Sequence, residues 1–189
     1  NVSSIFKNLA EGFRYAFSNQ VIVAVIVITV FMNLLLFPYM TMVTVVSKVL
    51  LEVGPFLMGI LMASDGLGAL VGSAIIAAQS SMKSHGRIFF YGSILSLIAL
   101  LLFSISGWYL LSVFTLLILG CGTSGFGTMQ SAIVLLVSDT EHRGRALGTV
   151  TIAIGAGPIG ALIIGAVSES IGVANALLIN AFIGLVIVS

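Results

Sequence analysis

Long apolar stretches alternate with short polar breaks along this chain of 189 residues. A helix needs about 20 apolar residues to cross a hydrocarbon core about 30 Å thick. Helices satisfy their own backbone hydrogen bonds in lipid, and the stretches lack the apolar–polar alternation of strands in a membrane β-barrel. We therefore predict six membrane-spanning helices, at residues 21–46, 55–78, 88–106, 108–137, 146–167 and 172–189.

Composition supports the same fold class. Hydrophobic residues make up 59% of the chain and charged residues 7%, which is too few charges to cover the surface of a soluble domain. We predict an all-α polytopic membrane protein in which residues 20–189 form a six-helix transmembrane bundle. The lipid bilayer is its first expected partner.

Residues 1–19 form a different kind of segment. Five apolar side chains recur at helical spacing and face away from three charged ones, which predicts a short amphipathic helix on the cytoplasmic membrane surface. A linker helix packed on the neighbouring spans is a compatible alternative. The apolar stripe contains Phe6, Leu9, Ala10, Phe13 and Phe17, and the charged face contains Lys7, Glu11 and Arg14.

The basic residues predict the orientation, because loops rich in Lys and Arg stay in the cytoplasm. Six of the seven precede the first span or lie in the loops after the second and fourth spans: Lys7, Arg14, Lys83, Arg87, Arg143 and Arg145. Only Lys48 lies on the opposite side, with Glu52 and Glu169. We expect a multi-pass cell-membrane protein with both ends of this segment in the cytoplasm.

Several functions find no support in the residues. Cys121 is the only cysteine, and His85 and His142 lie in separate loops, so no metal site is predicted. No catalytic motif or phosphate-binding loop is present, and we expect neither an enzyme nor a cofactor. The scattered basic residues make no electrostatic footprint for nucleic acid.

Glycine and proline mark the expected packing and bending points. Gly68 and Gly72 have the small-xxx-small spacing that lets two helix backbones approach closely. Pro38, and Gly157 with Pro158, predict kinks, because proline removes an intrahelical hydrogen bond. The fourth span is long, and its glycines predict a bend or a closely packed middle: Gly120, Gly122, Gly125 and Gly127.

Four local patterns together resemble the C-terminal half of a major facilitator superfamily (MFS) transporter, in the bacterial branch of enterobactin- and macrolide-exporter-like proteins. They are EGFRY at 11–15, GLGALVGS at 66–73, DTEHRGR at 139–145 and GAGPIG at 155–160. The chain also begins at Asn1 and ends inside an apolar run, as expected of a piece of a longer protein. The resemblance implies the seventh to twelfth helices of a twelve-helix carrier, whose N-terminal six-helix half is the main protein partner.

Asp65 is the most informative single residue, because it is an acid within the predicted span 55–78. A charge at the centre of the bilayer costs about 2.5–3.5 kcal/mol even on lenient insertion scales, so its presence needs a reason. A carboxyl group held away from water favours binding a proton, and Asp65 is our candidate for proton coupling. An acid hydrogen-bonded between helices, beside Gly68 and Gly72, is the structural alternative.

Three polar residues within other spans are candidates for a substrate pathway. Asn33, Gln130 and Asn180 lie in the first, fourth and sixth spans. Their side chains suit hydrogen bonding to a substrate, but they equally suit joining helices across the bundle.

The loop at 139–145 places opposite charges close together. Salt bridges there that form in one carrier state and break in another predict a cytoplasmic gate made by Asp139, Glu141, Arg143 and Arg145. A topogenic role for the basic residues is the alternative, and the two are compatible.

The predicted function is therefore secondary active transport. The resemblance implies ion-gradient-driven efflux of a small hydrophobic, drug-like or siderophore-like compound by alternating access, with protons as the expected coupling ion and the substrate near the midplane. The alternative is a scaffold or receptor bundle that binds a partner and transports nothing.

Overall fold

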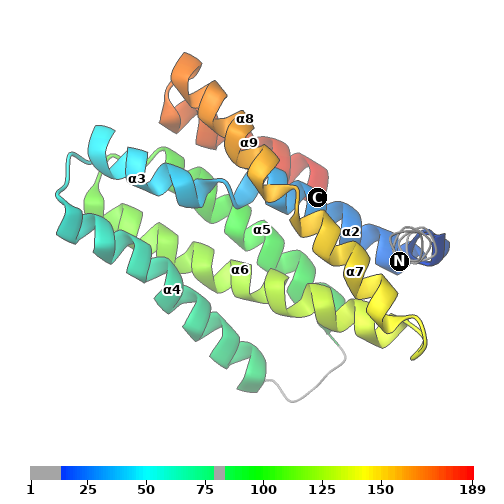
Figure 1. Ribbon diagram of the computed structural model, residues 1–189. Coiled ribbons are helices and arrows are strands. Elements are labelled where there is room, and N and C mark those ends of the chain that lie inside the picture. Colours follow the sequence, from blue (N-terminus) through cyan, green and yellow to red (C-terminus); the bar gives the residue numbers. More distant parts are fainter. Residues whose placement is uncertain (1–13, 79–83) are drawn as a thin grey trace.

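The computed structural model is described here over residues 14–78 and 84–189, and in that part of the chain the only regular secondary structure is helical. This confirms the predicted all-α class. The elements, shown in Figure 1, are α2 (Gln20–Phe31), the π-helix η1 (Met32–Leu36), α3 (Tyr39–Val49), α4 (Pro55–Ala78), α5 (His85–Ser104), α6 (Tyr109–Val137), α7 (Arg143–Ile154), α8 (Gly157–Ile171) and α9 (Val173–Val188).

Five helical stretches in the described residues are long and apolar enough to cross a membrane, and each overlaps one of the predicted spans. They are Gln20–Val49, Pro55–Ala78, His85–Ser104, Tyr109–Val137 and Arg143–Ile171. The sixth, α9, is an apolar helix of 16 residues, which at 1.5 Å per residue covers about 24 Å. The predicted helix at 1–19 falls mostly outside the described residues, which include only its helical end at 14–18.

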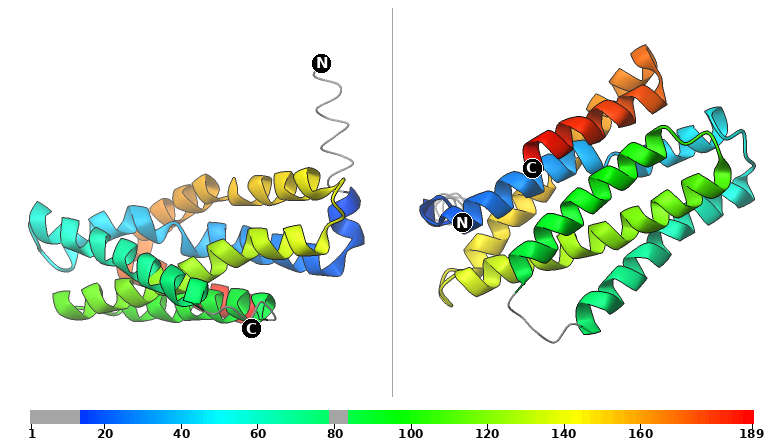
Figure 2. Two further views of the ribbon diagram at one scale, coloured as in Figure 1. Left: turned by 90° about the horizontal axis from the view of Figure 1, so that it is seen from below. Right: turned by 180° about the vertical axis from the view of Figure 1, so that it is seen from behind.

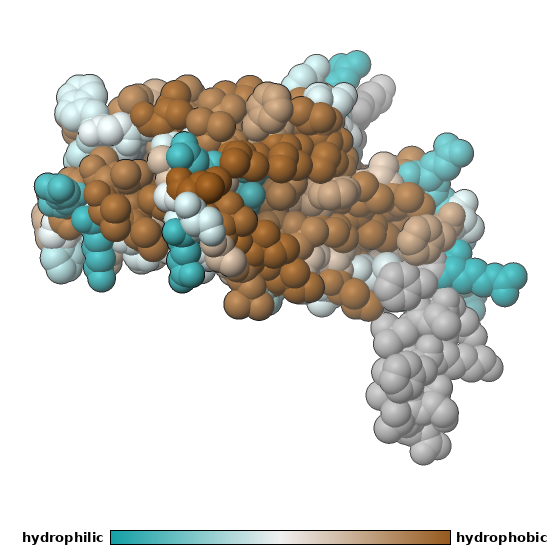
Figure 3. Space-filling model, turned by 90° about the horizontal axis from the view of Figure 1, so that it is seen from above, coloured by the Kyte–Doolittle hydropathy of each residue, from teal (hydrophilic) through white to brown (hydrophobic). Residues whose placement is uncertain are grey.

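The helices pack as neighbours in a simple pattern. α6 lies between α4 and α5, α9 packs on α5 and α8, and α2 packs on α6 and α7 (Figures 1 and 2). The outer surface is largely apolar, and in Figure 3 the hydrophilic side chains gather mainly toward the two ends of the long axis. Large apolar side chains such as Phe56 and Leu162 are 80% and 76% exposed, as expected of residues that face lipid.

The first span is interrupted at Pro38. Pro38 has no N–H to continue the helical ladder, and the preceding turn widens into the π-helix, where the Phe37 N–H donates to the Met32 carbonyl at 3.0 Å. Two carbonyl groups in this widened turn, those of Leu34 and Leu35, lie against α8 and α9. Neighbouring helices therefore cover the backbone that the proline disrupts, as membrane helices require.

The fifth span is interrupted as well. α7 ends at Ile154 and α8 begins at Gly157, and Pro158 takes the second position of α8, where a missing N–H costs nothing. A side chain at Gly160 would collide with the Leu34 carbonyl. The interruption lies where Gly157 and Pro158 predict a kink, and glycine at position 160 lets α8 reach the first span at its own break.

Glycines bring α4 and α6 into backbone contact. A Cβ atom at Gly68 would meet the Leu117 carbonyl, one at Gly72 would meet Ser124 and Cys121, and one at Gly120 would meet the Asp65 carbonyl. Gly122 makes a similar approach to Gly92 on α5. Gly68 and Gly72 thus lie where α4 and α6 approach closely, as does Gly120 on the α6 side, whereas Gly127 has open space at its Cβ position.

Replacing Gly68 with Ala tests this contact. The new methyl group must displace the Leu117 backbone, so we expect a loss of about 1–3 kcal/mol in the free energy of unfolding, measured by denaturant titration in detergent micelles. Gly66→Ala is the matched control, because it lies on the same helix with open space around its Cβ position. Equal stability of the two variants would contradict the proposed backbone contact.

Candidate functional site: a carboxyl group between two spans

Asp65 lies near the middle of α4, on the side that faces α3 and α6. Its own carbonyl group lies against Gly120, so the contact between α4 and α6 fixes the backbone that carries the carboxyl group. Its side chain is half-buried, and its Oδ1 atom is buried without a hydrogen-bond partner. Leu67, Leu70 and Val71, on the opposite side of α4, are exposed.

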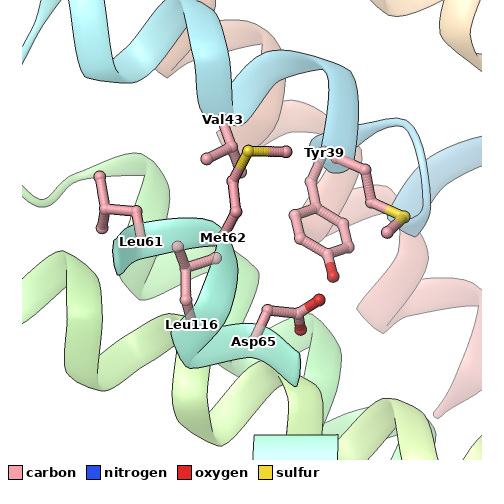
Figure 4. Close-up of a pocket in the computed structure, with 7 residues that line it drawn as sticks. Tyr39, Val43, Leu61, Met62, Asp65 and Leu116 are labelled. Carbon is pink, nitrogen blue, oxygen red and sulfur yellow. The ribbon is translucent and has the colours of Figure 1, made fainter. Parts of the chain in front are cut away.

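Tyr39 is the main polar neighbour of Asp65. It begins α3 directly after Pro38 and is only 2% exposed. Its hydroxyl group points toward the Asp65 carboxyl group (Figure 4). The break at Pro38 thus sets where the first span presents a hydroxyl group to the second.

A small cavity of about 50 Å³ lies between these two side chains. Its lining is apolar except for Tyr39 and Asp65, and Asp65 is the only charged residue in it. The lining consists of Tyr39, Met40 and Val43 from α3, Leu61, Met62 and Asp65 from α4, and Leu116 from α6 (Figure 4). A water molecule takes up about 30 Å³ of liquid, so the cavity has room for a water or a compact polar group.

The chemistry open to this carboxyl group follows from its surroundings. An ionised carboxylate in an apolar setting needs a counter-charge or several hydrogen bonds, and the lining provides one hydroxyl group and no cation. The free Oδ1 atom can bind a proton, a cationic group or a hydrogen-bond donor. In this arrangement the Oδ1 atom is therefore free to accept such a partner.

The three predicted pathway residues lie elsewhere, and each is buried. The Thr29 hydroxyl donates to the Gln130 side-chain oxygen at 3.1 Å, and the Asn33 amide donates to the Thr29 carbonyl at 2.8 Å. The Asn180 amide donates to the Leu35 carbonyl at 3.2 Å, beside the π-helix. The bonds of Gln130 and Asn180 join different spans, whereas that of Asn33 stays within the first span. None of the three residues lines the cavity at Asp65.

The charged loop at 139–145 is attached to the residues that precede the first span. The Tyr15 hydroxyl donates to Asp139 Oδ2 at 3.2 Å and accepts from the Asp139 backbone N–H at 3.0 Å. Its ring stacks on His142 with 4.4 Å between the ring centroids. Arg143 Nε donates to the Leu135 carbonyl at 3.1 Å, while Glu141 and Arg145 are exposed. A gating role for these charges stays a prediction.

Three residues that contact the predicted site residues were not themselves predicted from the sequence. Tyr39 was visible only as an aromatic residue after a proline, and Thr29 lies four residues before Asn33, on the same helix face. Tyr15 contacts a loop 124 residues away, and no local pattern predicts such a contact.

Among the residues that the structure describes, no cluster of His, Cys, Asp and Glu is suited to hold a metal ion.

The apolar spans, their glycine contacts and the carboxyl group between them define a polytopic helical membrane protein. Over residues 2–189 the chain matches the family described as transmembrane secretion effector, within the MFS transporters, and it belongs to that family. It is therefore a transporter-type membrane protein. No curated protein and no solved structure matches the chain.

Replacing Asn180 with Ala distinguishes helix joining from substrate binding. Loss of its bond leaves the partly buried Leu35 carbonyl without this donor, so we expect about 1 kcal/mol lower stability in micelles. Asn175→Ala is the control, because this exposed residue bonds only the Ile171 carbonyl of the preceding turn. Unchanged stability with reduced transport would instead favour a substrate contact at Asn180.

Proposed function

We propose that this chain is the C-terminal half of a secondary active carrier in the cell membrane. The carrier exports a small hydrophobic, drug-like or siderophore-like compound by alternating access, and an ion gradient drives it. The observation that carries the proposal is the Asp65 carboxyl group, which lies in the membrane-spanning part of the bundle with one oxygen buried and unpartnered. A purely structural acid would have its lone pairs satisfied by neighbouring helices.

The proton is the coupling ion that this site suits best. A carboxyl group in an apolar cavity is most stable when it is neutral, and contact with water favours its ionised form. A conformational change that exposes the cavity first to one side of the membrane and then to the other thus lets Asp65 bind and release a proton on different sides. The Tyr39 hydroxyl stabilises the ionised form while the cavity is open.

The burial of the spans supports a partner half. In α4 and in the span formed by α7 and α8, only 22% of the most apolar 18-residue stretch is buried inside the bundle. The corresponding share is 39–44% in the other three candidate spans. These two spans therefore have the largest free surface. We assign part of that surface to the N-terminal six-helix half and part to lipid, with the substrate held near the midplane between the two halves.

The two breaks give this bundle places to bend. The break before α3 lies directly beside Tyr39, and the break between α7 and α8 brings Gly160 against the same turn of the first span. Bending at either point changes where Tyr39 lies relative to Asp65. At the end of the bundle proposed to be cytoplasmic, Tyr15, which precedes the first span, bonds Asp139 of the charged loop. A gate that keeps the carrier in one of its two states needs a contact of this kind.

Replacing Asp65 with Asn tests the proposal directly. The amide keeps the shape but cannot take up a proton, so proton-driven transport by the full-length carrier in proteoliposomes should fall at least roughly tenfold and lose its pH dependence. Substrate flux is measured across an imposed pH gradient.

Glu169→Gln is the matched control, because it removes a carboxyl group from an exposed position near the end of α8. Its transport should equal that of the wild type. Unchanged rate and pH dependence in Asp65→Asn would remove Asp65 from the mechanism. A wild-type protein that folds and moves no substrate under any gradient would favour the scaffold or receptor function.

A further inference from the structure

We propose that the cavity between Tyr39 and Asp65 binds the compact ammonium group of an amphipathic amine. This inference rests on the proposed function, because it assumes that the cavity belongs to the transport path. It narrows the substrate class from hydrophobic compounds in general to those that carry a small cationic head on an apolar body.

The charge of the cavity selects a cation. Asp65 is the only charged residue among those that line it, and no Lys or Arg is present to hold an anionic group. The buried Oδ1 atom has no hydrogen-bond partner, so an ammonium N–H can donate to it without displacing a protein contact. Charge-assisted hydrogen bonds of this kind are about twice as strong as neutral ones.

The rest of the lining suits the same ligand. The ring of Tyr39 forms one wall, and aromatic rings attract cations placed near their faces. Met40 and Met62 add polarisable sulfur atoms on flexible side chains, which adapt to different ligand shapes. Val43, Leu61 and Leu116 complete the apolar part of the lining, and the attraction between an ammonium group and Asp65 is stronger beside apolar walls than in bulk water.

The size of the cavity limits which part of the ligand enters it. A volume of about 50 Å³ accepts a primary or methylated ammonium group and excludes a bulky aromatic system. The apolar body must therefore lie outside, and Met40 and Met62, which are 52% and 48% exposed, extend the apolar wall from the cavity to the surface. The ligand is thus anchored by its head and held loosely by its body.

Three naphthyl compounds of matched shape test the inference: naphthylbutylammonium, naphthylbutanol and naphthylbutanoate. Their binding to the full-length carrier in lipid nanodiscs is measured by equilibrium dialysis against empty nanodiscs. The ammonium compound should bind about tenfold or more tightly than the alcohol and the carboxylate, since it alone pairs with Asp65.

Variants locate the site. Asp65→Asn should weaken binding of the ammonium compound about tenfold or more and leave that of the alcohol unchanged. Tyr39→Leu removes the ring and should weaken ammonium binding about fivefold, whereas Tyr39→Phe keeps the ring and should lose less. Glu169→Gln should bind all three compounds as the wild type does. Each variant is first checked for wild-type thermal unfolding.

Equal affinity for the three compounds, or an ammonium affinity that Asp65→Asn leaves intact, would overturn the inference. Its failure is distinguishable from failure of the proposed function. If Asp65→Asn abolishes proton-driven transport while ammonium selectivity is missing, then proton coupling holds and only the substrate class is wrong.

Discussion

The backbone contact between α4 and α6 is the interaction on which the candidate site depends. Lipid provides no hydrophobic force that pulls one apolar helix toward another, so close packing at small residues must hold the pair together. The Tyr109 hydroxyl, which donates to the Leu57 carbonyl at 2.9 Å, adds a polar contact near one end of the pair. Because the Asp65 carbonyl itself lies against Gly120, the same contact that holds the helices also places the carboxyl group.

A second constraint is the absence of water, which obliges polar groups to find partners inside the protein. Where the first span breaks at Pro38, Gly160 covers the Leu34 carbonyl closely and Asn180 donates to the Leu35 carbonyl. Thr29 and Gln130 bond each other across α2 and α6. These buried polar groups therefore serve cohesion, whereas the Oδ1 atom of Asp65 is buried within a span without a partner.

The fold followed from the sequence more completely than the site did. Span length and apolar character predict helices locally, and the spacing of Gly68 and Gly72 or the ring of Pro38 acts within one helix, so these features could be read without a structure. Asp65 was visible because its charge is unusual at that depth. Tyr39 as its neighbour was not, since that contact depends on how α3 leaves the break at Pro38 and packs on α4. The hydrogen bonds of Gln130 and Asn180 also required the packed bundle, because each reaches another span.

The central claim is that the Asp65 carboxyl group takes up and releases a proton within the membrane during transport. Carbodiimides that dissolve in lipid react with protonated carboxyl groups in apolar surroundings, so labelling followed by mass spectrometry measures this state at a single residue. The account predicts that Asp65 is labelled in the full-length carrier, that labelling stops proton-driven transport, and that it declines as the pH rises. An Asp65 that stays unlabelled at every pH, or whose labelling leaves transport unchanged, would contradict it.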